Sequence, residues 1–168
     1  RLSLVGSEMC IRDRDSIRNG LMDIHERYNS DNDVVLIHDA IRPMLLPEII
    51  TDNIRVCRRY GNAITVVPCT AAMLKTYDSL STEEQVARDN LKITQTPQAF
   101  YVNDIIDAHR EALSKGITNS VASCTMYIEL GRKLYMSKGS EKNLKLTTTE
   151  DIEIFKALLQ AKKDEWMH

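Results

Sequence analysis

The sequence predicts an α/β fold with a mainly parallel sheet, because strand signals alternate with helix signals from Ser16 onward. The continuous apolar run Val34–Ile37 is typical of a strand that is covered on both faces, and residues 63–67 predict another buried strand. At 168 residues, the chain is long enough for one domain with a core and short for two. We therefore expect a single domain over residues 15–168.

Capping residues and helix breakers mark the first predicted helices. Asp15 or Ser16 can begin a helix before the first buried strand, because either side chain accepts hydrogen bonds from the free N–H groups of a first turn. Pro47 suits the first turn of a second helix, and Gly61 ends it. The second buried strand follows directly.

The C-terminal half of the chain is predicted to contain further helices and short strands. Apolar spacing predicts helices over residues 102–116 and 122–130, and short apolar segments predict strands over 134–136 and 144–146. Thr147 and Glu150 are spaced as in a capping box, in which each residue bonds a backbone N–H near the other. A final helix therefore begins at this point.

Between the second buried strand and the third helix, the periodicity weakens. Residues 79–88 are polar, and the flanking segments 73–75 and 91–93 are short and strand-like. We expect this stretch to leave the sheet as a projecting arm that spans about residues 69–95.

Composition excludes several classes of protein. The chain has 22 basic and 24 acidic residues, a formal net charge of −2, which argues against a nucleic-acid partner. No apolar run reaches the roughly 20 residues that cross a bilayer, so no membrane association is expected. The four cysteines form no CxxC pair, which favours free thiols and a cytoplasmic location.

The N-terminal residues 1–14 are set apart from the predicted domain. The chain begins with Arg1, and its first apolar patch covers only residues 2–5, which is too short for a secretory signal. We expect this segment to be foreign to the domain or to be a disordered terminus.

The first candidate site follows the first buried strand. His38 and Asp39 stand directly after it, at the carboxyl edge where open α/β folds bind ligands. Asp39 could hold Mg²⁺, and Arg42 could bind a phosphate with its planar guanidinium. The structural alternative is that Asp39 caps a turn and Arg42 pairs with a surface acid.

Two further candidates are single side chains beside short strands. Pro97 disfavours a helical conformation at Thr96, whose hydroxyl could form an anion site together with Arg88. Lys145, on the predicted strand 144–146, could neutralise phosphate charge at the same sheet edge. The alternatives are a turn-forming loop at Thr96 and an exposed lysine before a capped helix.

Four segments in order give the chain a family resemblance. They are DSIRNGL at residues 15–21, HDA with RP at 38–43, QTPQ at 95–98, and NLK with the following TED at 143–151. From about residue 15 to residue 159 the chain resembles the cytidylyltransferases that act on polyol phosphates, of the 2-C-methyl-D-erythritol 4-phosphate and ribitol 5-phosphate types. The resemblance implies a Rossmann-like, three-layer nucleotidyltransferase fold.

The resemblance also implies roles for particular residues. Ser16, Asp39, Ala40, Arg42 and Lys145 would bind CTP, with Asp39 holding Mg²⁺; Arg88 and Thr96 would bind the polyol phosphate; Lys145 and Arg88 would be catalytic. The reaction would be attack of the substrate phosphate on the α-phosphorus of CTP, with release of pyrophosphate. The arm would reach the site of a partner subunit, which implies a homodimer.

The sequence departs from the family pattern at three places. The family begins with a strand and a glycine-rich loop that grips the triphosphate, whereas the six glycines here are scattered. We therefore expect the chain to lack both elements and, on its own, to release no pyrophosphate from CTP. Ala71-Ala72 replaces an Asp-Thr pair, and Thr118-Asn119 stands where the family has Thr-Asp.

These departures bear on the identity of the acceptor more than on nucleotide chemistry. 2-C-methyl-D-erythritol 4-phosphate, an isoprenoid precursor, is the favoured acceptor, and ribitol 5-phosphate, used for cell-surface polymers, is the alternative. The alternatives from other classes are a non-catalytic α/β binding module and a structural dimer partner.

Overall fold

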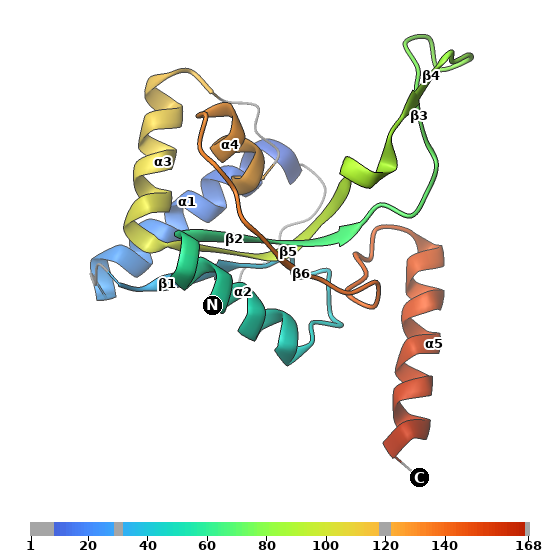
Figure 1. The fold of residues 1–168 in the computed structure, drawn as a ribbon. Helices are drawn as coiled ribbons and strands as arrows, with labels where there is room; N and C mark the ends of the chain where they lie inside the picture. The colour runs from blue at the N-terminus through green and yellow to red at the C-terminus, as the bar shows by residue number, and fades with distance from the viewer. Residues whose placement is uncertain (1–8, 29–31, 118–121, 167–168) are drawn as a thin grey trace.

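The computed structural model describes residues 9–28, 32–117 and 122–166 of the chain (Figure 1). Thr118-Asn119 and residues 1–8 of the set-apart N-terminal segment lie outside these ranges. The elements are α1 (Met9–Tyr28), β1 (Val34–Ile37), α2 (Pro47–Tyr60), β2 (Asn62–Pro68), β3 (Met73–Lys75), β4 (Glu84–Val86), the 3₁₀ turn η1 (Arg88–Asn90), β5 (Lys92–Tyr101), α3 (Val102–Ser114), α4 (Ser123–Glu129), β6 (Met136–Lys138) and α5 (Thr149–Trp166).

The main sheet of the described chain is mixed, with the strand order β1-β5-β2-β6. β5 pairs antiparallel with both β1 and β2, whereas β2 and β6 are parallel. β1, β2 and β6 therefore share one direction, and β5 alone runs against them. The α/β class is confirmed, but the expectation of mainly parallel pairing is corrected. β5 brings the chain back from the arm beside the strand by which it left, so it reverses direction.

Helices cover both faces of this sheet and confirm the three-layer arrangement (Figure 1). α1, α3 and α4 lie on one face, where Leu21, Ile64 and Phe100 belong to one buried cluster. α2 lies on the other, where Ala63 and Ala99 belong to a second cluster. Adjacent residues of β2 and β5 thus enter opposite layers, as the alternation of side chains along a strand requires.

The ends of α2 follow the sequence signals, whereas α1 begins earlier than predicted. Pro47 is the first residue of α2, and Gly61 ends it with φ +97°, a left-handed conformation that glycine adopts readily. α1 already begins at Met9, so Ser16 lies inside the helix rather than at its N-cap. No Pro or Gly stands between residues 9 and 16 to stop the helix from extending.

The free cysteines of the described chain include Cys57 and Cys124, both buried. Burial raises the pKa of Cys57 to about 11 and also raises that of Cys124. A raised pKa keeps the thiol protonated, and therefore a weak nucleophile. Both side chains are packing residues, as predicted for free thiols.

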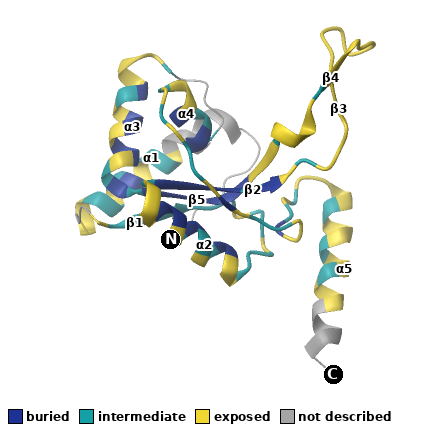
Figure 2. Cartoon of the chain, in the orientation of Figure 1, coloured by how far each residue is buried: buried dark blue, intermediate teal, exposed yellow. Residues whose placement is uncertain are grey.

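The arm is a two-stranded antiparallel hairpin of β3 and β4 that projects from the body (Figure 1). Its base is still part of the sheet, because Pro68 pairs with Lys92 across β2 and β5. The arm is mostly exposed (Figure 2), with Leu80 93% and Tyr77 83% accessible. The projecting excursion therefore exists, but β5 has already begun at Lys92, before the predicted arm ends at residue 95.

The last helix, α5, is capped one residue later than predicted. Asp151 Oδ2 accepts hydrogen bonds from the backbone N–H groups of Thr147 and Thr148, and Thr148 Oγ1 accepts one from the Asp151 N–H. The capping pair is thus Thr148 and Asp151 instead of Thr147 and Glu150. These backbone donors hold the pKa of Asp151 below its usual range. Within the described ranges, no helix combines the length and apolarity that crossing a membrane requires.

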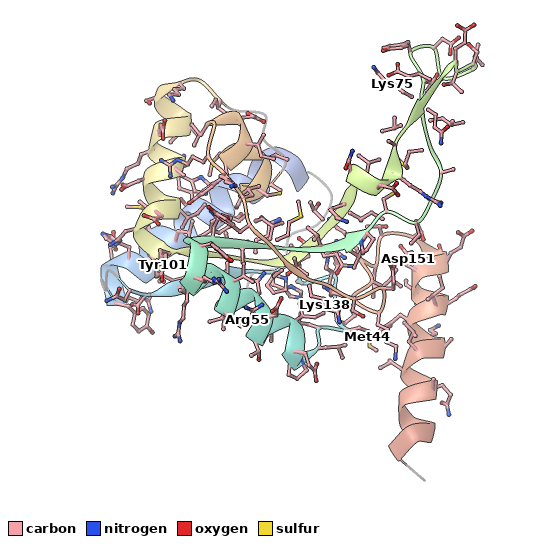
Figure 3. The ribbon with its side chains drawn as sticks, viewed as in Figure 1. Met44, Arg55, Lys75, Tyr101, Lys138 and Asp151 are labelled. Carbon is pink, nitrogen blue, oxygen red and sulfur yellow. The ribbon has the colours of Figure 1, made fainter. Side chains whose placement is uncertain are left out.

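A buried carboxamide ties α2 to the sheet. Asn53 is fully buried and donates to Ser137 Oγ at 2.7 Å, Thr65 Oγ1 at 3.0 Å and the Pro97 carbonyl at 3.2 Å. A second link lies at the surface, where the Asp52 carboxylate accepts the backbone N–H of Lys138 at 2.9 Å. That bond, helped by Arg55, lowers the pKa of Asp52; Figure 3 shows Arg55 on α2 and Lys138 on β6.

We predict that Asn53→Ala lowers the free energy of unfolding by about 2–4 kcal/mol, because it removes the buried hydrogen bonds from Asn53 to Ser137, Thr65 and Pro97 and leaves a cavity in their place. Urea denaturation measures the change. The matched control is Thr51→Ala on the same helix, at an exposed position, with an expected change within about 0.5 kcal/mol. Equal effects of the two variants would contradict a stabilising role for the buried network.

Candidate functional site

The candidate site begins at the turn that follows β1. The Arg42 N–H donates to the Asp39 carbonyl at 3.0 Å, which closes a tight turn with Ala40 exposed inside it. The Asp39 side chain is 33% accessible. The end of the strand thus presents a carboxylate to solvent at the sheet edge, where the sequence placed it.

Two cations from different parts of the chain meet this carboxylate. Arg42 Nε lies 3.2 Å from Asp39 Oδ2, and Lys145 Nζ lies 3.4 Å from the same oxygen. Arg42 is only 10% accessible, whereas Lys145 is 44% accessible. The predicted convergence of these three side chains is therefore observed. Their formal charges sum to +1, so the cluster favours an anionic ligand.

Lys145 reaches the cluster from a loop rather than from a strand. The Arg42 Nη1 donates to the Asn143 carbonyl at 2.8 Å, and the Leu146 N–H donates to the Ile41 carbonyl at 2.8 Å. The strand predicted over residues 144–146 is not formed. These two bonds, one of them from a side chain, replace the ladder of a strand. Arg42 therefore has a positioning contact on each side, to Asp39 and to the Lys145 loop.

Thr96 joins the same cluster from β5. Its Oγ1 accepts the Asp39 N–H at 3.0 Å and lies 2.9 Å from His38 Nδ1. The register of β5 shifts here: Ile64 pairs with Gln98, but Val66 pairs with Thr94, so β5 advances four residues while β2 advances two. Such a bulge re-aims side chains, which explains how Thr96 leaves the regular ladder.

Sequence reasoning missed the residues that hold the Lys145 loop against this bulge. Asn143 is fully buried and donates from Nδ2 to the Thr96 carbonyl at 2.8 Å. Gln95 Nε2 donates to the Ser140 carbonyl at 2.9 Å, and its Oε1 accepts the Ser140 N–H at 3.3 Å. Both Asn143 and Gln95 belong to the segments that carry the family resemblance, yet nothing in their spacing indicates a supporting role.

Gly139 permits the close approach of this loop to β2. Its N–H donates to the Val66 carbonyl at 2.9 Å. A Cβ atom at this position would lie 2.5 Å from Gln95 Oε1 and 2.9 Å from the Val66 carbonyl oxygen. A larger residue therefore requires the loop to move away from the sheet.

Other predicted site residues lie apart from this cluster. Arg88 is exposed in η1 at the base of the arm, where its Nη1 donates to the Thr70 carbonyl at 3.0 Å. Ser16 is exposed on α1. Among the residues that the structure describes, no hydrogen bond or ion pair joins either of them to Asp39, Arg42 or Lys145. Ala71-Ala72 is exposed where the chain enters the arm.

The cluster offers a single carboxylate as a metal ligand. No group of three or more His, Cys, Asp or Glu side chains suited to a metal occurs in the described ranges. Mg²⁺ commonly binds one or two carboxylates and completes its shell with waters and substrate phosphates. Both cations contact Asp39 Oδ2, and the part-exposed carboxylate has a second oxygen to offer. The site therefore fits a metal that arrives together with a phosphate ligand.

Comparison with known proteins gives one consistent family. A family model described as "IspD: 2-C-methyl-D-erythritol 4-phosphate cytidylyltransferase" matches residues 10–161. A ribitol-5-phosphate cytidylyltransferase from Lacticaseibacillus paracasei is 37% identical over 150 residues, which cover 88% of this chain and 64% of that protein. A 2-C-methyl-D-erythritol 4-phosphate cytidylyltransferase from Clostridium botulinum (strain Langeland) is 37% identical over 149 residues, 88% of this chain and 62% of that protein. The chain thus spans less than two thirds of these relatives.

Solved structures share the fold. The 2-C-methyl-D-erythritol 4-phosphate cytidylyltransferase from Thermus thermophilus superposes with a TM-score of 0.76 at 23% identity, over 94% of this chain and 72% of that one. A 4-diphosphocytidyl-2C-methyl-D-erythritol synthase from Anaerococcus prevotii gives 0.75 at 26% identity, over 88% and 66%. The Rossmann-like α/β architecture expected from the sequence is confirmed.

We predict that Gly139→Ala destabilises the fold by about 1–3 kcal/mol, because the added methyl group overpacks the contact with Val66. Urea denaturation gives the magnitude. Gly20→Ala is the matched control, since its added Cβ meets nothing within 4 Å on α1. It is expected to stabilise the helix by roughly 0.5–1 kcal/mol. If Gly139→Ala is as stable as the control, the loop is not held as close to β2 as described.

Proposed function

Because the chain belongs to the 2-C-methyl-D-erythritol 4-phosphate cytidylyltransferase family, we propose that its function is the transfer of a cytidylyl group from CTP to a polyol phosphate, with release of pyrophosphate. The observation that carries this proposal is the convergence of Arg42 and Lys145 on Asp39. A non-catalytic binding module has less support, because the curated relatives are named as cytidylyltransferases.

Ribitol 5-phosphate is the acceptor that we propose. The sequence favoured 2-C-methyl-D-erythritol 4-phosphate, but relatives named ribitol-5-phosphate cytidylyltransferase support the alternative better. They include proteins from Lacticaseibacillus paracasei and from Streptococcus agalactiae serotype III, each 37% identical, the latter over 91% of this chain. A relative named 2-C-methyl-D-erythritol 4-phosphate cytidylyltransferase matches at 37% identity over 88% of the chain.

The proposed reaction joins a phosphate oxygen of the acceptor to the α-phosphorus of CTP and breaks the bond between the α-phosphorus and the bridging oxygen. Such a transfer needs little covalent help from a protein, and positioning and charge neutralisation supply most of the acceleration. Lys145 is accessible enough to donate to a phosphate oxygen. Arg42 is nearly buried, so its main part in this scheme is to hold Asp39 and the Lys145 loop in register.

Mg²⁺ is the cofactor that we propose, with Asp39 as its protein ligand. When bound, the cation would neutralise charge on the triphosphate oxygens. Asp39 would hold the cation through its part-exposed carboxylate, and Lys145, beside it, would donate to a phosphate oxygen.

The remaining predicted roles are part of the same proposal. Ser16 and Ala40 would line the nucleotide site, Thr96 would contact the acceptor, and Arg88 would serve the acceptor phosphate and catalysis from the base of the arm. The exposed apolar side chains of the arm, Tyr77 and Leu80, support its insertion against a second copy of the chain in a homodimer. The cysteines are free thiols, which are typical of a reducing compartment. Together with CTP as the proposed substrate, they favour a cytoplasmic location.

The acceptor is tested by comparing kcat/KM for ribitol 5-phosphate and 2-C-methyl-D-erythritol 4-phosphate in the gene product that carries this chain. We expect at least about a tenfold preference for ribitol 5-phosphate, equivalent to about 1.4 kcal/mol in transition-state binding. The readout is pyrophosphate release from CTP with Mg²⁺. A preference for the erythritol compound would reverse the acceptor assignment, and no turnover with either compound would reject the function.

The role of Lys145 is tested in the same gene product by Lys145→Met, with Lys142→Met as an exposed control in the same loop. Loss of the positive charge that Lys145 would place beside the reacting phosphate is expected to lower kcat about 10²–10³-fold. The control is expected to keep kcat within about twofold, and both variants should match the wild-type melting temperature. An unchanged kcat in Lys145→Met would show that the Lys145 ammonium does not take part in the reaction.

A further inference from the structure

His38 bridges two segments of the candidate site through both of its ring nitrogens. Nδ1 lies 2.9 Å from Thr96 Oγ1 on β5, and Nε2 lies 3.2 Å from the Arg42 carbonyl oxygen. The residue is half-buried directly after β1. One side chain therefore contacts both β5 and the far end of the turn that presents Asp39.

The partners of the ring determine which nitrogen carries the proton. The Arg42 carbonyl can only accept, so Nε2 must donate to it. Thr96 Oγ1 already accepts the Asp39 N–H at 3.0 Å and has one proton of its own to donate. That proton pairs with an unprotonated Nδ1. The opposite tautomer would set a lone pair of Nε2 against the carbonyl oxygen.

These hydrogen bonds form a closed circuit around the turn that follows β1. The Asp39 N–H is fixed to the Thr96 hydroxyl, the hydroxyl to His38, and His38 to the Arg42 carbonyl. The Arg42 N–H returns to the Asp39 carbonyl at 3.0 Å. Both ends of the turn are thus held against β5, and the hydroxyl of Thr96 is engaged on both sides.

We propose that His38 is a positioning residue for the reaction: by contacting Thr96 through Nδ1 and the Arg42 carbonyl through Nε2, it holds the Asp39 turn against β5 and so fixes the spacing between the nucleotide side and the acceptor side of the site. The assignment of a nucleotide side and an acceptor side rests on the proposed function. The hydrogen bonds by which His38 holds the turn do not. His38 acts through Asp39 and Thr96 and is not a catalytic residue.

The hydrogen bonds of His38 are tested on the 168-residue chain with measurements that do not depend on activity. Nitrogen-15 NMR of His38 is expected to show a protonated Nε2 and an unprotonated Nδ1, whereas a free imidazole exchanges between tautomers. Hydrogen exchange of the Asp39 amide is expected to be at least tenfold faster in Thr96→Val, which lacks the hydroxyl, and to stay near wild type in Thr96→Ser. Averaged tautomers, or equal exchange in the two variants, would overturn the proposal.

The positioning role is tested in the gene product with variants that each keep only one of the two hydrogen bonds of His38, either the one to Thr96 or the one to the Arg42 carbonyl. His38→Asn can still accept from Thr96 but cannot reach the Arg42 carbonyl, and His38→Gln can do the reverse. We expect each to lower kcat about tenfold and His38→Ala about 100-fold, with KM for CTP within about threefold, since a misplaced group acts mainly on the transition state. A kcat within twofold of wild type in His38→Asn and His38→Gln would reject positioning.

These outcomes separate the inference from the function on which it rests. If the wild-type gene product shows no turnover with either polyol phosphate, the proposed function fails, and the NMR and exchange results still decide whether His38 locks the turn. If His38→Ala does not fold, the Asn and Gln variants carry the kinetic test.

Discussion

The bulge of β5 at Gln95, Thr96 and Pro97 is the constraint on which the site depends. The turn after β1 bonds to the Thr96 hydroxyl, and the loop before α5 bonds to the Thr96 carbonyl and to Gln95. From the other face, Asn53 donates to the Pro97 carbonyl. Segments that are distant in the chain thus share one short stretch of backbone. A regular strand would have used these carbonyl groups in its ladder, so the bulge makes them available.

The charges of the cluster depend on this support because attraction alone would not order them. An ion pair near the surface contributes little, about 0–1 kcal/mol, and long side chains lose entropy when they are held in one geometry. Arg42 avoids much of that loss, since a second bond from its guanidinium to the Asn143 carbonyl already fixes it. Lys145 stays the more accessible partner of Asp39. The site therefore combines a fixed guanidinium with an adaptable ammonium.

Much of the fold could be predicted from local sequence signals. Pro47 and Gly61 mark the observed ends of α2, and the apolar runs coincide with β1 and most of β2. The direction of β5 could not be predicted, because it depends on where the arm returns to the sheet. The strand predicted around Lys145 fails for a related reason. An alternating pattern reports which side chains are apolar, but here Arg42 and Ile41 supply the hydrogen bonds that a neighbouring strand would otherwise provide.

In the candidate site, too, the charged residues could be predicted from the sequence, whereas the residues that support them through long-range hydrogen bonds could not. Asp39, Arg42 and Lys145 were identified as site residues because their types and order suit phosphate chemistry. Asn143 and Gln95 stand in the motifs of the family resemblance, but a buried amide has no chemistry of its own that would indicate a role. Their importance lies in bonds across 47 and 45 residues, to the Thr96 carbonyl and to Ser140. Gln95 uses both the donor and the acceptor of its amide on Ser140, and Asn143 donates to the Thr96 carbonyl. An uncharged amide can make such bonds in the interior without the desolvation cost that an ion would bring. The charged residues thus stand at the rim, and neutral amides beneath them set the distances between them.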